Sequence, residues 1–405
     1  MRRVTPRSIA ELEQVVAWAV AEEKPLEVLG AGSKRGFGRP VDADLELVTS
    51  ELAGIDMYEP AELVMSAGAG TPLAEIEAAL AGKNQMLAFE PADYGAITGG
   101  EAARQTIGGV FAANVSGPRR IAAGAARDHL LGLQLVTGHG QIVKTGGRVV
   151  KNVTGYDLCK LLTGSFGTLA VMSHLTFKVL PAPETSGTLL VARADEASAI
   201  EVACRAMGTA FDVSAAAVLP PEAAARSTVE AVRGAGRTLA ALRLEGPAPS
   251  VAYRLRALRA ALGEAEAVEC SSLEGDASRL IWREIRDLSL LGEAKGPLWR
   301  LSVAPTAAAG MVDRLAEFAS ERLYDWSGGL VWLRPSTDAG AGEQDVRSAV
   351  AQVGGHATLV RGDADARRAA PFQPQPPALR ALTGRVKRSF DPKAVLNPGR
   401  MYAGI

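Results

Sequence analysis

Glycine and other small residues recur between residues 104 and 171, and they constrain this chain more than any other feature. The runs are Gln105 to Gly109, Asn114 to Gly117, Gly124 to Asp128 and Gly164 to Val171. Glycine lets a backbone approach a ligand closely, and the N–H groups freed in such turns suit phosphate and carbonyl oxygens. The stretch therefore predicts a binding site for a large phosphorylated cofactor.

Composition narrows the class of protein. The chain has 405 residues, of which 47% are hydrophobic and 22% charged, and this predicts a soluble globular protein of two domains. The net charge of -1, with no basic stripe interleaved with aromatics, argues against a nucleic-acid partner. Cys159, Cys204 and Cys270 are odd in number and lack a Cys-x-x-Cys spacing. We therefore expect a reducing compartment, no disulfide framework and no iron–sulfur cluster in this chain.

The sequence predicts neither a membrane-spanning helix nor a secretory signal. No apolar run approaches the ~18 residues that a transmembrane helix needs. Acidic residues between Glu11 and Glu23 interrupt the first hydrophobic stretch, so it does not resemble a secretory signal. We expect a cytoplasmic location, with peripheral attachment at the inner face of the plasma membrane, through a complex, left open.

A second glycine loop, Gly30 to Gly38, follows a strand predicted at residues 26–29 and could hold a pyrophosphate through successive N–H groups. The dinucleotide-binding Rossmann turn is disfavoured, because Arg35 stands where its third glycine belongs and Pro40 follows too soon for a helix. A P-loop is excluded, because no Gly-Lys-Ser/Thr ending is present. A flexible connection between strands remains the alternative.

Local patterns predict an α+β protein. Ser8 and Glu11 form a capping box for a helix that ends by Pro25, and a hairpin turns at residues 137–140. Short strands and few helices do not fit regular βαβ winding. We expect a first domain over residues 1–182, a smaller α+β domain over 183–384, and a segment over 385–405 that docks back on the first. Residues 361–378 are predicted to be a loop or linker.

Four residues are candidates for catalysis. His129 follows Asp128, which could orient it as a general base, although neighbouring strand residues point to opposite faces. Arg286, together with the nearby Arg283 and Arg300, could grip a small carboxylate bidentately, with packing against tryptophan as the alternative. The remaining two candidates are Lys151 and His356.

Five segments together carry a resemblance to a known family: Lys151 to Asp157, Gly164 to Val171, Leu323 to Trp332, Gly355 to Leu359 and Phe390 to Tyr402. In this order they resemble the vanillyl-alcohol oxidase and p-cresol methylhydroxylase superfamily, and within it the FAD-binding E subunits of bacterial glycolate oxidases. The resemblance covers essentially the whole chain. It implies a PCMH-type FAD-binding domain of two subdomains, followed by an FAD-linked oxidase C-terminal (cap) domain.

The resemblance also implies which residues hold FAD. The first glycine loop and Gly108-Gly109 would bind the pyrophosphate, residues 114–128 would line the ribityl and ring end, and residues 167–171 would close over the cofactor. The implied cofactor-binding residues are Gly30, Ala31, Gly32, Ser33, Lys34, Arg35, Ile107, Gly108, Gly109, Asn114, Gly117, Gly124, Arg127, Asp128, Asn152, Gly167, Thr168 and Val171.

Two departures from the superfamily shape the functional prediction. Ser33 stands where some members carry a flavin-linking histidine, so FAD binding is expected to be noncovalent. The His-x-Gly-Asp-x-Asn metal motif of the catalytic relatives does not occur, so no metal is expected. The resemblance therefore implies a glycolate oxidase subunit that works with a catalytic flavoprotein and an iron–sulfur partner, oxidising glycolate or D-lactate and passing electrons to a quinone-type acceptor. The alternatives are a self-sufficient FAD-dependent hydroxy-acid or aldonolactone dehydrogenase, and a non-catalytic assembly scaffold with a vestigial flavin site.

Overall fold

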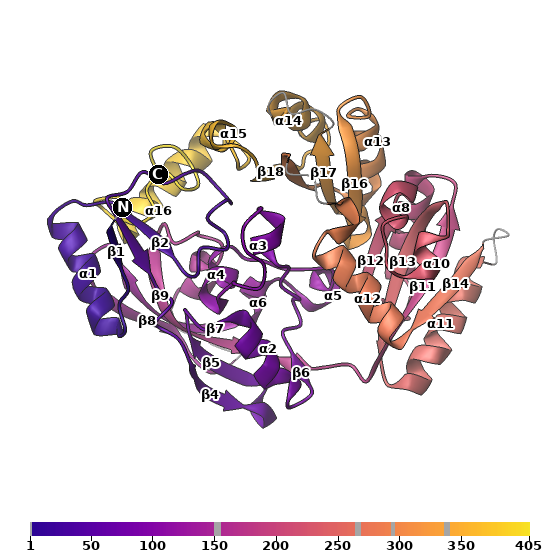
Figure 1. Ribbon diagram of the computed structural model, residues 1–405, viewed down its shortest axis with the longest axis horizontal. Coiled ribbons are helices and arrows are strands. Elements are labelled where there is room, and N and C mark those ends of the chain that lie inside the picture. The colour runs from indigo at the N-terminus through magenta and orange to yellow at the C-terminus, as the bar shows by residue number, and fades with distance from the viewer. Residues whose placement is uncertain (1, 150–154, 264–268, 293–295, 336–340) are drawn as a thin grey trace. The chain divides into compact units, whose positions relative to one another are not determined.

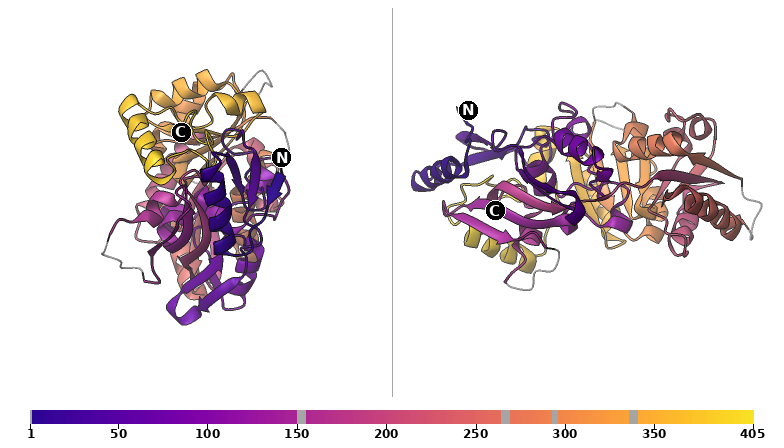
Figure 2. Two further views of the ribbon diagram at one scale, coloured as in Figure 1. Left: turned by 90° about the vertical axis from the view of Figure 1, so that its left-hand side faces the viewer. Right: turned by 90° about the horizontal axis from the view of Figure 1, so that it is seen from below.

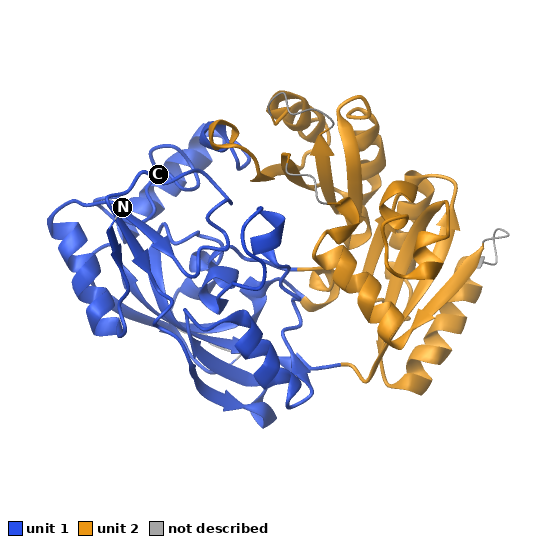
Figure 3. Ribbon diagram, in the orientation of Figure 1, with its two compact units in different colours: residues 1–116, 124–182, 367–405 blue, residues 117–123, 183–366 orange. Residues whose placement is uncertain are grey.

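The computed structural model describes residues 2–149, 155–263, 269–292, 296–335 and 341–405. Its contacts divide the chain into two compact units (Figure 3). Unit 1 contains residues 1–116, 124–182 and 367–405, and unit 2 contains residues 117–123 and 183–366. Both units mix helices with sheets, which confirms the α+β prediction.

Unit 1 is built on two larger sheets (Figure 1). The first is parallel, in the order β1 (Arg2–Val4), β3 (Leu45–Val48), β2 (Leu26–Leu29). The second is antiparallel, in the order β4 (Ile55–Glu59), β5 (Val64–Gly68), β9 (Ala170–Lys178), β7 (Leu130–Thr137), β8 (Ile142–Gly146). A small pair joins β6 (Gln85–Met86) to β10 (Leu180–Pro181). The predicted hairpin is confirmed by β7 and β8.

The first helix of unit 1 begins where its sequence predicts. The hydroxyl of Ser8 accepts the Glu11 N–H at 3.2 Å, which confirms the predicted start of the first helix. Its apolar face, Leu12, Val16 and Ala19, is fully buried in a cluster to which strands of both sheets contribute. The helices of this unit are α1 (Ile9–Ala21), α2 (Leu73–Ala81), α3 (Tyr94–Ile97), α4 (Ile107–Ala112), α6 (Ala126–His129), α7 (Leu158–Leu162) and α16 (Pro377–Phe390).

The end of the chain returns to the strands near its beginning. The segment after α16, yellow in Figures 1 and 2, forms a parallel bridge between Leu396 and Leu26. Val395 and Leu396 are buried in the same cluster as the core face of α1. Residues 391–397 thereby add an edge to the parallel sheet, beside β2, and fix the loop that follows β2.

Unit 2 is one eight-stranded antiparallel sheet with helices packed on it. The strand order is β14 (Cys270–Glu274), β11 (Thr185–Arg193), β13 (Thr238–Gly246), β12 (Ala215–Leu219), β16 (Ala319–Asp325), β17 (Leu330–Pro335), β15 (Leu298–Ser302), β18 (His356–Arg361). Its described helices are α5 (Arg120–Ala123), α8 (Glu196–Met207), α9 (Pro221–Ala224), α10 (Glu230–Arg233), α11 (Ala248–Gly263), α12 (Gly275–Arg286), α13 (Ala308–Asp313) and α14 (Glu343–Ala351). Short 3-10 turns complete both units: η1 (Pro60–Glu62), η2 (Ser289–Leu291), η3 (Pro305–Ala307) and η4 (Trp326–Gly328).

Two segments group differently from the expected domain ranges. Residues 367–384 belong to unit 1, because Arg367 donates to the carbonyl of Gly38 at 3.0 Å and Arg39 donates to that of Ala369 at 2.9 Å. Residues 117–123 belong to unit 2, where the Arg119 guanidinium forms an ion pair with Glu245. The prediction of a loop over residues 361–378 was wrong in part, since helix α15 (Ala364–Ala369) precedes the prolines.

Candidate cofactor-binding site

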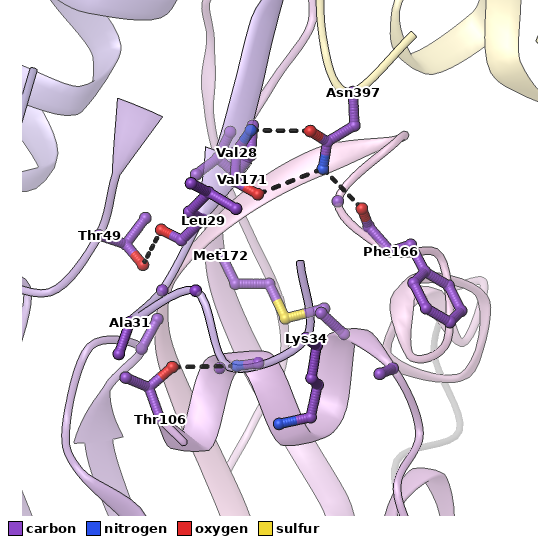
Figure 4. Close-up of a pocket in the computed structure, with 18 of the residues that line it drawn as sticks. Val28, Leu29, Ala31, Lys34, Thr49, Thr106, Phe166, Val171, Met172 and Asn397 are labelled. Carbon is purple, nitrogen blue, oxygen red and sulfur yellow. Dashed lines mark hydrogen bonds between the residues drawn. The ribbon is translucent and has the colours of Figure 1, made fainter. Parts of the chain in front are cut away.

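A pocket in unit 1 lies where four segments meet (Figure 4). They are the loop that follows β2, helix α4, the turn over residues 164–168 before β9, and the C-terminal segment. Backbone atoms of glycines and small side chains make up much of its wall. The predicted cofactor residues that line it are Gly30, Ala31, Gly32, Ser33, Lys34, Arg35, Gly108, Gly109, Gly167 and Val171.

The loop after β2 needs glycine at two positions for two different reasons. A Cβ atom on Gly30 would lie 2.4 Å from the hydroxyl oxygen of Thr106, so the loop and the start of α4 could not pack as they do. Gly32 has φ +78° and nothing within 4 Å of its added Cβ, so its conformation, and not its packing, requires glycine. The loop is therefore held close to α4 and exposes its backbone to the pocket.

Adjacent glycines in α4 have different neighbours. A Cβ on Gly108 would lie 2.7 Å from the carbonyl oxygen of Ala69, inside the protein. A Cβ on Gly109 would lie 3.3 Å from the Thr106 hydroxyl and 3.9 Å from the Lys34 ammonium nitrogen. Gly108 therefore allows the helix to pack, whereas Gly109 leaves room next to Lys34.

Lys34 brings a cation into the pocket (Figure 4). Its Nζ donates to Oε1 of Gln105 at 2.7 Å, and the Gln105 amide donates in turn to the carbonyl of Ala92 at 2.9 Å. Burial lowers the pKa of Lys34 to about 7, although the carboxylate of Asp93 acts in the opposite direction. A bound anionic group would remove this penalty, so the pocket is suited to a phosphate.

Arg35 holds the loop that follows β2 through contacts with strands β2 and β3. Its guanidinium bridges two buried carboxylates, donating from Nε to Glu27 at 3.1 Å and pairing with Glu46 at 2.9 Å. These contacts raise the pKa of Arg35 despite desolvation. The residue that breaks the Rossmann pattern is therefore a brace for the loop through its side chain.

Two residues of the C-terminal segment, Asn397 and Arg400, also line the pocket. The Asn397 carboxamide accepts the Val28 N–H at 2.7 Å and donates to the carbonyl of Phe166 at 2.7 Å, joining β2 to the turn before β9 (Figure 4). Arg400 donates to the carbonyl of Lys34 at 2.8 Å, and burial lowers its pKa to about 10. Neither role was expected from the sequence, although Asn397, with φ +42°, lies in an Asn-Pro-Gly turn that indicates a special backbone conformation.

A buried ion pair anchors this segment. The Lys387 ammonium donates to Oδ2 of Asp391 at 2.6 Å, to the carbonyl of Thr168 at 2.6 Å and to that of Leu396 at 2.9 Å. The Asp391 carboxylate also accepts the N–H groups of Val395 and Leu396. All three ammonium hydrogens are used, which offsets the cost of burying the pair. Burial lowers the pKa of Lys387.

The other predicted cofactor residues do not line this pocket in the described part of the chain. Asn114 accepts the Arg127 N–H at 3.0 Å, and Asp128 accepts the Ala125 N–H at 2.9 Å next to Gly124, so these residues hold a turn together. Asp128 also pairs with Lys160 at 3.3 Å. The remaining predicted residues are Ile107, which is buried, Thr168, which accepts from Lys387, Gly117, which belongs to unit 2, and Asn152, which lies outside the described residues.

The described candidate catalytic residues lie in different surroundings. His129 is fully buried, 5.2 Å from the ring of Phe89. The Arg286 guanidinium is occupied by both carboxylate oxygens of Asp287, at 2.9 and 2.7 Å. His356 is exposed at the start of β18. Lys151 lies outside the described residues.

Unit 2 instead concentrates two cations on one indole ring. The guanidinium carbons of Arg120 and Arg300 lie 4.3 and 5.1 Å from the ring centroid of Trp326. The indole N–H donates to the carbonyl of Gly117 at 3.1 Å. Trp326 and Ser327 have φ values of +52° and +58°, a strained conformation for residues with side chains. Such a cluster can attract a carboxylate, and only Arg300 was expected from the sequence.

Among the described residues, no group of three or more His, Cys, Asp and Glu side chains is arranged to hold a metal ion. Within the same residues, no helix is both long and apolar enough to span a bilayer.

This chain is similar in sequence to known proteins. Residues 2–146 match a family described as an FAD binding domain. The chain is 33% identical over 407 residues to the glycolate oxidase subunit GlcE of Escherichia coli (strain K12), with 100% of both chains covered. It is 26% identical over 438 residues to the glycolate oxidase subunit GlcD of Bacillus subtilis (strain 168), covering 99% of this chain and 88% of that one.

A solved structure shows the same fold at much lower identity. p-Cresol methylhydroxylase with bound substrate matches with a TM-score of 0.70 and 15% identity, covering 98% of this chain and 88% of the other. This match confirms the predicted PCMH-type architecture.

Proposed function

Because this chain belongs to the family of the glycolate oxidase subunit GlcE, we propose that it is the FAD-binding subunit of a heteromeric enzyme that oxidises glycolate or D-lactate to the 2-oxo acid. The family is one of FAD-linked hydroxy-acid oxidoreductases, and FAD is its cofactor. The observation that carries the proposal is a full-length family match combined with a desolvated lysine in a glycine-walled pocket.

The residues of the pocket divide into three roles for holding FAD. Lys34 supplies positive charge for the pyrophosphate, and Gly32 and Gly109 leave room for it beside exposed backbone. Asn397 and Arg400 hold the walls of the pocket in place. Asn397 joins β2 to the turn before β9, and Arg400 joins the C-terminal segment to the loop that follows β2. Ser33 offers no group for a covalent flavin link, so binding is noncovalent.

Bound FAD supplies the two-electron redox chemistry, for which this chain has no side-chain substitute. The work of the protein is to bind, orient and shield the cofactor. We further propose that a catalytic flavoprotein subunit and an iron–sulfur subunit complete the enzyme and that a quinone-type acceptor takes the electrons. The GlcE and GlcD relatives are both named as subunits, which supports a complex, and this chain has no Cys-x-x-Cys spacing for a cluster of its own.

The cluster around Trp326 favours a second candidate function. Arg120 and Arg300 could attract the carboxylate of a hydroxy acid, in which case this chain would oxidise the substrate without a catalytic partner. The two candidates differ in one measurable property, the reduction of the flavin by substrate in the isolated chain.

The test is the visible spectrum of the purified chain, followed by anaerobic addition of glycolate. We expect bound oxidised flavin that stays oxidised until the partner subunits are added. Bleaching by glycolate in the isolated chain would establish the second candidate. A purified protein that neither contains flavin nor takes it up would refute both and leave an assembly scaffold.

A further inference from the structure

Helix α16 borders two adjoining hollows on unit 1, and neither is part of the cofactor pocket. One has a volume of about 260 Å³ and is lined mainly by apolar side chains of α7, α16 and the C-terminal segment, including Leu379, Leu382 and Val386. The other is lined by Arg380, Arg385 and Arg388 and adjoins the first, because Lys387 and Ile405 line both hollows. A surface that combines an apolar hollow with a basic one is complementary to a segment that is apolar and acidic.

The apolar hollow is open to solvent. Leu379 and Leu382 are each 46% exposed, and Leu161, on the other wall, is 40% exposed. Cavities of roughly 150 Å³ already hold a benzene-sized group, so a hollow of about 260 Å³ has room for a large side chain. Exposed leucines around such a hollow are typical of a docking site and not of a free surface.

The charge of α16 is one-sided. Its sequence, Pro377 to Phe390, contains Arg380, Arg385, Lys387 and Arg388 and no acidic residue. Lys387 is neutralised by Asp391, but within the described residues neither Arg385 nor Arg388 makes an ion pair. The partner is therefore expected to carry carboxylates beside its apolar side chains.

The apolar hollow shares a wall with the cofactor pocket. Phe166 and Gly167 line the pocket, whereas Gly164, Ser165 and Thr168, in the same turn, line the hollow. Lys387 in α16 and Asn397 after it both donate to carbonyls of this turn. A protein bound in the hollow would lie against the back of the turn that borders the cofactor, which suits a redox partner.

We propose that the surface formed by Leu161, Leu379, Leu382, Arg385 and Arg388 is the docking site for an apolar and acidic segment of a redox partner subunit. This inference rests on the proposed function, because it needs a heteromeric enzyme. A lipid surface is disfavoured, since the leucines line a concavity rather than a protruding apolar face.

The test measures binding of the FAD-loaded chain to its purified catalytic flavoprotein and iron–sulfur subunits. We expect the double variant Leu379→Glu/Leu382→Glu to weaken binding to one of them by about tenfold or more, because it loses apolar burial and adds like charge. Arg385→Glu/Arg388→Glu is expected to weaken the same binding and to remove its salt dependence. Both variants should retain flavin absorbance, since neither pair lines the cofactor pocket.

Tyr253→Glu is the matched control, because Tyr253 is 62% exposed in α11 of unit 2 and the same kind of change there should leave binding intact. If the leucine variant binds both subunits with wild-type affinity, the docking site is refuted and the proposed function stands. A wild-type chain that binds neither subunit would overturn both. Leucine-dependent binding to anionic phospholipid vesicles, or leucine-dependent self-association, in place of subunit binding would overturn the docking proposal.

Discussion

Replacing Lys34 with methionine should separate the charge of the pocket from its shape. Burial lowers the pKa of Lys34 from 10.5 to about 7 in the empty pocket, a shift that corresponds to about 5 kcal/mol against the charged form. The free energy of unfolding of the flavin-free protein therefore falls as the pH falls from 10.5 towards 7. Over this range the unfolded chain binds a proton at Lys34, whereas the folded protein resists protonation there. A bound pyrophosphate favours the ammonium form and returns the pKa towards 10.5 or higher.

Binding of FAD should therefore be accompanied by uptake of a proton. At about pH 8.5 only about 3% of Lys34 is charged in the empty pocket, and nearly all of it is charged in the complex, so about one proton is taken up. At about pH 6 the empty pocket is already about 90% charged, and uptake falls to about 0.1 proton. The dissociation constant should rise about tenfold per pH unit between about pH 7.5 and 9.5.

The measurement is calorimetric titration of flavin-free protein with FAD in buffers that differ in ionisation enthalpy, at both pH values. Lys34→Met should abolish the pH-dependent uptake and flatten the affinity profile. Lys83→Met, at an exposed lysine after α2, is the control and should behave as the wild type. Uptake of a full proton at about pH 8.5 by the Lys34 variant, or no uptake by the wild type, would show that Lys34 is not the group that meets the phosphate.

Three further substitutions test the walls of the pocket. Gly109→Leu should abolish flavin absorbance, because the added side chain enters the pocket, and should change the free energy of unfolding by about 1 kcal/mol or less. The control is Gly310→Leu in α13, where a Cβ meets open space, and it should change neither quantity. Asn397→Ala leaves the Val28 N–H and the Phe166 carbonyl without their partner and should lower the free energy of unfolding by about 2–4 kcal/mol and accelerate flavin release; unchanged release would contradict a wall-holding role. Lys387→Met leaves the Asp391 carboxylate buried without a counter-ion and should cost about 3–5 kcal/mol by chemical denaturation, so a loss below about 1 kcal/mol would mean that the pair is solvated.

The sequence around Arg35 correctly argued against a Rossmann turn but did not predict what the Arg35 side chain contacts. Its place in the loop excluded a Rossmann turn, and the structure contains no such turn at β2. Its partners, Glu27 and Glu46, lie on two strands whose pairing no local rule predicts. The brace could be recognised only once β2 and β3 were known to be neighbours.

What the catalytic candidates can reach depends on packing in the same way. His129 was singled out by its neighbour Asp128, but burial against Phe89 decides what that imidazole can reach. Arg286 was chosen for its guanidinium, and the adjacent Asp287 occupies it. Exposure and pairing depend on packing, which a motif does not contain.

The α+β class, the family and the positions of the glycine loops could be predicted from the amino-acid sequence alone. These depend on backbone freedom and on the order of motifs along the chain, both of which are local properties. Three features became apparent in the folded chain: Asn397 and Arg400 line the pocket, Lys34 is desolvated there, and Gly108 and Gly109 have different neighbours. Each of these depends on residues far apart in sequence, since a hydrogen bond or a desolvation penalty exists only after the chain has brought both groups together.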